Sequence, residues 1–146
     1  MKRVLLAGLA TLSFAGCSKN DDAKPAAPSL VGGTWTLTSQ TIVVTPKGGG
    51  TSTTYTQRVV PNTVKLTYLA NGNYHVYFDK SISATGTTTT TDGTYTYSGT
   101  TITYLIDNNT STARVDVLTS TNLTHVVTSE DVAGTQVNVT TNMYTR

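Results

Sequence analysis

The feature that most constrains the fold of this chain is a period-two alternation of apolar and polar residues along much of its length. Val64, Leu66 and Tyr68, for example, fall on one face, and the two polar residues between them fall on the other. Successive side chains of a β-strand point to opposite faces of its sheet, so this pattern indicates strands with one buried face. The 33 threonines and eight tyrosines suit such a pleated surface, and no stretch has apolar residues at helical spacing. We therefore predict an all-β protein.

The turn sequences predict how the strands are connected. Asn71 and Gly72 form the strongest hairpin signal, because both residues tolerate a positive φ. Most other connections are also short, which favours an antiparallel up-and-down meander, and closing the sheet into a β-barrel removes its exposed edges. We expect a barrel in preference to a sandwich, which needs longer crossovers. The eight to nine predicted strands are 34–45, 53–60, 64–68, 74–79, 94–97, 101–106, 115–117, 123–127 and 137–143.

The N-terminus has the layout of a secretory signal. Lys2 and Arg3 precede an apolar run over 4–14, and two small residues stand directly before Cys17, the only cysteine. This arrangement resembles the lipobox of bacterial lipoproteins, in which the cysteine sulfur receives a diacylglycerol and the signal is cleaved before it. The resemblance implies that 1–16 is a lipoprotein signal peptide and that Cys17 is the lipidation site.

Residues 17–28 read as a flexible tether, because they are charged and then rich in Pro and Ala. Asp21 and Asp22 resemble the surface-export signal of Bacteroidota-type lipoproteins, although they also suit a plain soluble linker. The expectation is an outer-membrane lipoprotein at the periplasmic face or the cell surface, held to the membrane by lipid, with residues 29–146 as one domain.

Charge and chemistry exclude several classes of function. Without residues 1–16, the chain has eight basic and eight acidic side chains and no cluster of Lys or Arg, so we expect no nucleic-acid partner. Its two histidines have no close partner at metal-ligand spacing, and no phosphate loop or nucleophile elbow is present. We expect a protein that is not an enzyme, with no cofactor and no metal site.

Three motifs in order resemble the lipocalin-like domain of small bacterial lipoproteins. Gly33-Thr34-Trp35 matches the Gly-x-Trp that opens the first lipocalin strand, and 69–74 and 93–99 continue the likeness. The resemblance implies a lipocalin-like β-barrel with Gly33 and Trp35 at its closed end. In lipocalins a basic side chain from near the end of the last strand covers this tryptophan. The resemblance implies this role for Arg146, with Arg114 as the alternative.

Aromatic residues are the candidates for a ligand-binding lumen. If they point inward, they present aromatic faces with hydroxyl tips that suit a small hydrophobic or amphipathic ligand. Alternatively they fill the barrel, and the protein is a non-catalytic envelope component that contacts a protein or glycan partner. A cavity above about 300 Å³ favours ligand binding. The candidate residues are Tyr68, Tyr74, Tyr95, Tyr97, Tyr104 and His125, the last also being suited to a hydrogen-bonded structural role.

Overall fold

The computed structural model describes residues 28–83 and 85–146, and the predictions for 1–16 and Cys17 lie outside this part. Within it every regular element is a strand, and no helix of a length and hydropathy that could cross a bilayer is present. The strands are β1 (Thr34–Pro46), β2 (Thr53–Gln57), β3 (Val64–Tyr68), β4 (Asn73–Phe78), β5 (Thr89–Ser98), β6 (Thr101–Ile106), β7 (Asn109–Leu118), β8 (Asn122–Glu130) and β9 (Gln136–Thr145).

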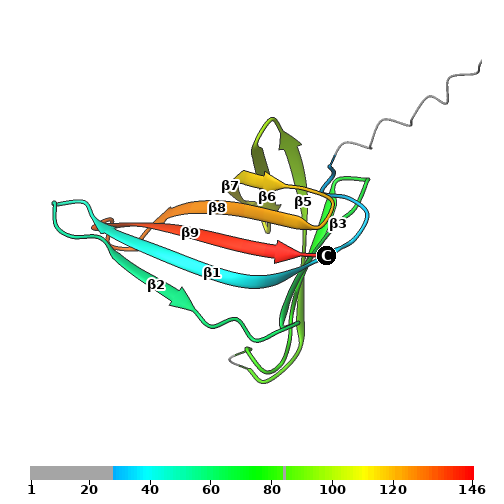
Figure 1. The fold of residues 1–146 in the computed structure, drawn as a ribbon, viewed down its shortest axis with the longest axis horizontal. Helices are drawn as coiled ribbons and strands as arrows, with labels where there is room; N and C mark the ends of the chain where they lie inside the picture. The colour runs from blue at the N-terminus through cyan, green and yellow to red at the C-terminus, as the bar shows by residue number, and fades with distance from the viewer. Residues whose placement is uncertain (1–27, 84) are drawn as a thin grey trace, which may run out of the picture.

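The sheet closes into an antiparallel barrel (Figure 1). Strand order is β2-β1-β3-β4-β5-β6-β7-β8-β9, and β1 also pairs with β9. That closing ladder runs from Thr36 opposite Thr145 to Pro46 opposite Gln136. Eight strands therefore form the barrel and β2 is an additional strand, which confirms the predicted all-β fold with its first and last strands joined.

β2 departs from the predicted meander, because it pairs with β1 and not with β3. β1 is long enough to hold two partners in succession along one edge: β3 beside Thr34–Thr36 and β2 beside Gln40–Val44. The connection between these partners contains Pro61, which has no N–H for a ladder. The next residue, Asn62, has a φ of 63° and turns the chain. The predicted second strand consequently ends at Gln57 rather than at residue 60.

Several strands are longer than the alternation predicts, and β5 and β7 exceed it most. β5 begins at Thr89 and β7 at Asn109, whereas the apolar alternation begins only near 94 and 115. The added residues are mostly exposed on both faces. Apolar and polar residues therefore do not alternate there, and a search for that alternation misses these parts of the strands. The turn before β7 is tight, with positive φ at Asp107 and Asn108, which is the geometry that two-residue hairpins prefer.

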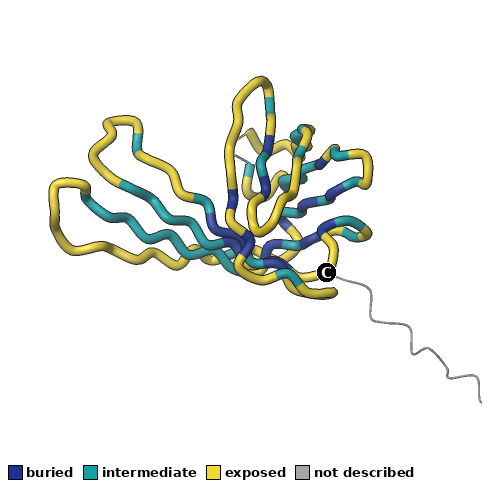
Figure 2. Tube along the Cα trace, turned by 90° about the horizontal axis from the view of Figure 1, so that it is seen from above, coloured by how far each residue is buried: buried dark blue, intermediate teal, exposed yellow. Residues whose placement is uncertain are grey.

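The barrel is closed at one end and splayed at the other. β7 and β8 pair only from Arg114–Leu118 to Leu123–Val126, so residues 127–130 of β8 have β9 as their single partner. A four-stranded sheet, here called the wing, projects from the barrel (Figure 1). It consists of residues 127–130 of β8, 136–141 of β9, 41–46 of β1 and all of β2. Buried residues gather away from the hairpin tips (Figure 2).

A β-bulge in β1 decides which side chains face the interior. Leu37 lies opposite Tyr144 and Ser39 opposite Met143, so Thr38 is an extra residue, and its hydroxyl donates to the Met143 carbonyl (3.0 Å). An inserted residue moves all following side chains to the other face. Gln40 therefore joins Leu37 on the interior face.

Candidate functional site

Trp35 closes one end of the barrel. Its side chain is fully buried, and its indole Nε1 donates a hydrogen bond to the Leu30 carbonyl (2.9 Å). The guanidinium carbon of Arg146 lies 4.2 Å from the centre of a Trp35 ring, close enough for a cation–π interaction. The segment before β1 thus meets the edge of the indole, and the residue after β9 lies over its face.

Arg146 is held in place by backbone groups. Its Nε donates to the Ser120 carbonyl (2.7 Å) and its Nη1 to the Val31 carbonyl (3.2 Å). A Cβ at Gly33 would lie 3.0 Å from Arg146 Cδ, so glycine at this position leaves room for the arginine stem. Arg114 instead pairs with Asp116 (2.6 Å), and it does not cover the tryptophan.

Next to Trp35, tyrosines fill the barrel. The hydroxyls of Tyr68 and Tyr104 are 2.5 Å apart, and Tyr74 and Tyr104 pack with ring centres 4.9 Å apart. Tyr95 meets Tyr68 edge-on at 4.9 Å and donates to the Leu69 carbonyl (3.1 Å). Burial raises the pKa of Tyr104 to about 12 and that of Tyr68 well above its usual value, so these hydroxyls remain protonated.

Tyr97 lies apart from this cluster. Its partner across the ladder is the buried Ile102, so it is on the interior face of β5. It nevertheless stands beside the turn at Gly99 and is 40% exposed. Tyr97 thus lies at the end of the barrel, one residue before the end of β5, and its role in a ligand-binding lumen stays a prediction.

His125 is buried, and both of its ring nitrogens have polar partners. Asn142 Nδ2 and Tyr144 Oη each lie 3.1 Å from its Nε2, and Tyr104 Oη lies 3.4 Å from its Nδ1. Burial lowers the pKa of His125 to about 4, so the imidazole is neutral at pH 7. With the Asn142 amide donating to Nε2, the ring proton is on Nδ1, facing Tyr104.

A row of polar side chains crosses the sheet at this level. Strand register aligns Gln57, Gln40, Asn142 and His125 on β2, β1, β9 and β8 respectively. Gln40 Nε2 donates to Asn142 Oδ1 (2.7 Å), and Asn142 Nδ2 in turn donates to His125 Nε2. Sequence reasoning identified His125 but missed Gln40, Asn142 and Tyr144.

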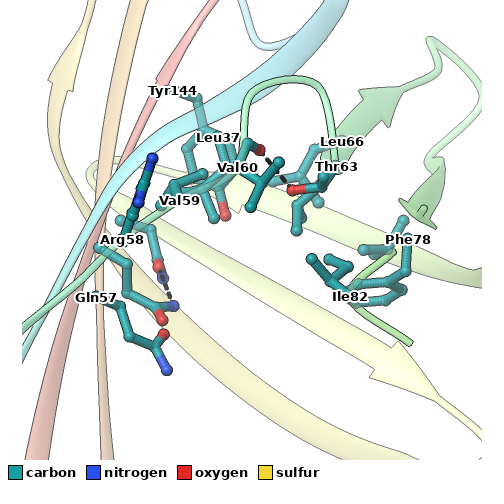
Figure 3. Close-up of a pocket in the computed structure, with 14 residues that line it drawn as sticks. Leu37, Gln57, Arg58, Val59, Val60, Thr63, Leu66, Phe78, Ile82 and Tyr144 are labelled. Atoms are coloured by element: carbon teal, nitrogen blue, oxygen red, sulfur yellow. Dashed lines mark hydrogen bonds between the residues drawn. The ribbon is translucent and has the colours of Figure 1, made fainter. Parts of the chain in front are cut away.

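A cavity of about 430 Å³ opens beside this row (Figure 3). One wall is apolar and comes mainly from β3, β4 and their neighbouring loops, and the other carries the amides of β1 and β9. A smaller hollow of about 180 Å³ reaches Tyr74, Tyr104 and His125 between β7 and β8. The larger cavity is lined by Leu37, Gln40, Gln57, Arg58, Val59, Val60, Thr63, Val64, Leu66, Val76, Phe78, Ile82, Asn142 and Tyr144.

The second histidine belongs to a different surface. His75 Nδ1 lies 2.6 Å from Asp92 Oδ1, and the two side chains are 40% and 72% exposed. Within residues 28–83 and 85–146, no three His, Cys, Asp or Glu side chains gather as a metal site requires. The polar groups that line the larger cavity are amides, two hydroxyls and the guanidinium of Arg58.

Two solved structures share this architecture. A lipocalin-like protein from Bacteroides uniformis superposes with a TM-score of 0.51 at 16% identity, covering 81% of this chain and 99% of that one. An uncharacterized protein from Bacteroides eggerthii gives a TM-score of 0.50 at 13% identity with the same coverage. No protein-family model matches the chain. No curated protein matches it either. The barrel therefore has a lipocalin-like fold.

Because Trp35 is fully buried at the closed end, we expect truncation of its indole to cause a large loss of stability. Trp35→Ala is expected to lower the free energy of unfolding by about 3–5 kcal/mol, because it leaves a cavity and an unpaired carbonyl. Arg146→Ala is expected to cost about 0.5–2 kcal/mol through loss of the stacking contact. Denaturant melts followed by circular dichroism measure both changes. A Trp35→Ala variant as stable as the parent would show that the indole does not carry the core.

His125 predicts an acid-sensitive fold. Its folded-state pKa of about 4 lies below the unfolded value of 6.5, so its contribution is complete above pH 6.5 and is lost as pH falls toward 4. The free energy of unfolding is expected to drop by about 3 kcal/mol between pH 7 and pH 4. Denaturant midpoints across this range measure the drop. His125→Gln should remove most of the dependence, whereas His75→Gln should retain it, and equal curves for the two variants would contradict the assignment.

Proposed function

We propose that this chain is a lipid-anchored envelope lipoprotein that binds a small hydrophobic or amphipathic molecule in the open cavity of its barrel. The observation that carries this proposal is the cavity of about 430 Å³ at the splayed end. Pockets for small ligands have volumes of about 300–1,000 Å³ and are mostly apolar with a few polar groups. The lining beside Gln40 and Asn142 has this composition.

The cavity also supports a particular location for the ligand. Tyr68, Tyr74 and Tyr104 occupy the barrel next to Trp35, so a ligand would lie at the mouth rather than in a deep cup. The apolar wall would take its hydrocarbon part, because removing such surface from water contributes about 25 cal/mol per Å². The tyrosine-filled part of the barrel supports the second candidate, an envelope protein that contacts a protein or glycan through its outer surface.

The chemistry of the cavity favours binding over catalysis. Activating a nucleophile needs a base beside it, commonly with a third group to orient that base. His125 is a neutral ring whose described partners are tyrosine hydroxyls and the Asn142 amide, with no carboxylate among them. We therefore propose a non-catalytic role that requires no cofactor.

Filling the cavity is expected to abolish ligand binding. Val60 lines it and is 47% exposed, so a Val60→Trp side chain can cover the mouth without disturbing the core (Figure 3). The neutral probe N-phenyl-1-naphthylamine should bind the parent with enhanced fluorescence, and Val60→Trp should weaken that binding by about tenfold or more. Val132→Trp is the matched control, because Val132 is fully exposed and outside the cavity. A parent protein that fails to bind the probe would favour the second candidate.

The anchoring proposal rests on the sequence Ala15-Gly16-Cys17. Cys17→Ser is expected to leave an uncleaved precursor and to remove the protein from the membrane fraction, because several acyl chains are needed for stable anchoring. Fractionation and intact-mass measurement of the membrane-extracted parent provide the test. A parent cysteine without acyl mass would refute lipidation, while leaving the proposed cavity function standing.

A further inference from the structure

The amide wall of the cavity has a defined hydrogen-bonding polarity. Gln40 Nε2 donates to Asn142 Oδ1, and Asn142 Nδ2 donates to His125 Nε2, so the hydrogen bonds run in one direction along the row. Each amide nitrogen carries two protons, and each uses one of them in these bonds. Among the described residues, Gln40 Oε1 accepts no hydrogen bond, and it is not enclosed in the core. The wall beside the cavity therefore offers both an unused acceptor and unused donors.

The cavity lining is almost free of charge. Of its 14 residues, only Arg58 carries a charge, and none is acidic. Arg58 is exposed at the mouth beside Val59, where solvent and salt screen its field. Asn142 and His125, in contrast, are only 7% and 5% exposed. A charged group placed against the amide wall would lose hydration without gaining an opposite charge.

These two observations discriminate among ligand head groups. A carboxylate only accepts hydrogen bonds, so it can use the unused N–H groups of the wall but leaves Gln40 Oε1 without a donor. An ammonium only donates, and it would find no anion in the lining. A primary amide does both: its N–H can donate to Gln40 Oε1 while its carbonyl accepts from an unused N–H of Asn142 or Gln40.

We infer that the ligand is an amphiphile with an uncharged head that both donates and accepts hydrogen bonds, such as a primary amide. This inference rests on the proposed function, and it specifies the chemistry of the same site. The head lies against Gln40 and Asn142, and the hydrocarbon tail lies against the opposite wall, which includes Val64, Leu66 and Phe78.

Octanamide and octanoate provide a matched pair for the test, because they share one hydrocarbon tail and their heads have almost the same shape. Each is titrated at pH 7.5 against the purified full-length protein loaded with N-phenyl-1-naphthylamine. Octanamide is expected to displace the probe at about a tenfold lower concentration than octanoate, because it gains hydrogen bonds to the amide wall and does not bury a charge. Equal potency, or tighter binding of octanoate, would overturn the inference and would assign the head-group contact to Arg58.

Two glutamine variants test whether the preference for octanamide over octanoate arises at Gln40. Gln40→Leu should reduce the octanamide-to-octanoate preference to about twofold or less, because it removes the acceptor Oε1. Gln136→Leu makes the same change at an exposed position of β9 outside the cavity, and it should keep the full preference. A Gln40→Leu variant that keeps the preference would overturn the assignment to the amide wall. Binding of the probe without displacement by octanamide would overturn this inference alone, whereas failure of the probe to bind would overturn the proposed function with it.

Discussion

The pairing of β1 with β9 is the constraint on which the rest of the structure depends. It joins the first and last strands of the barrel, so that no edge remains where Trp35 is buried. Arg146 follows β9 directly, and the same pairing brings its guanidinium over the indole. Farther along the ladder, Gln40 lies opposite Asn142, and this register creates the amide wall of the cavity. One ladder thus determines both the closed end and the open end.

The fold could be predicted from the sequence because its signals are local or repeated. Alternation located the buried strands, and the turn at Asn71 and Gly72 defined a hairpin that the structure contains between β3 and β4. The position of β2 could not be predicted in this way. β2 and β3 both pair with the same edge of β1, and the residues of 53–57 carry no signal that shows which part of that edge β2 takes.

The candidate site was harder to predict than the fold. His125 stood out because it alternates with the apolar Leu123 and Val127, and the tyrosines because of their number. Gln40 gave no such signal, because uninterrupted alternation from Trp35 places it on the outer face. The bulge at Thr38 reverses this assignment, and the bulge exists only in the register with β9, about a hundred residues away in the chain.

The closed and splayed parts of the barrel satisfy their polar groups in different ways, so one small domain combines a filled core with an open cavity. Near Trp35, tyrosine hydroxyls and His125 bond to one another, so buried polar atoms have partners without any buried charge. Such a network needs no ligand to be complete. At the cavity, however, Gln40 and Asn142 use only part of their capacity on each other. In the proposed function, a ligand would replace water at the remaining groups, so binding at this wall would exchange hydrogen bonds and gain the burial of hydrocarbon.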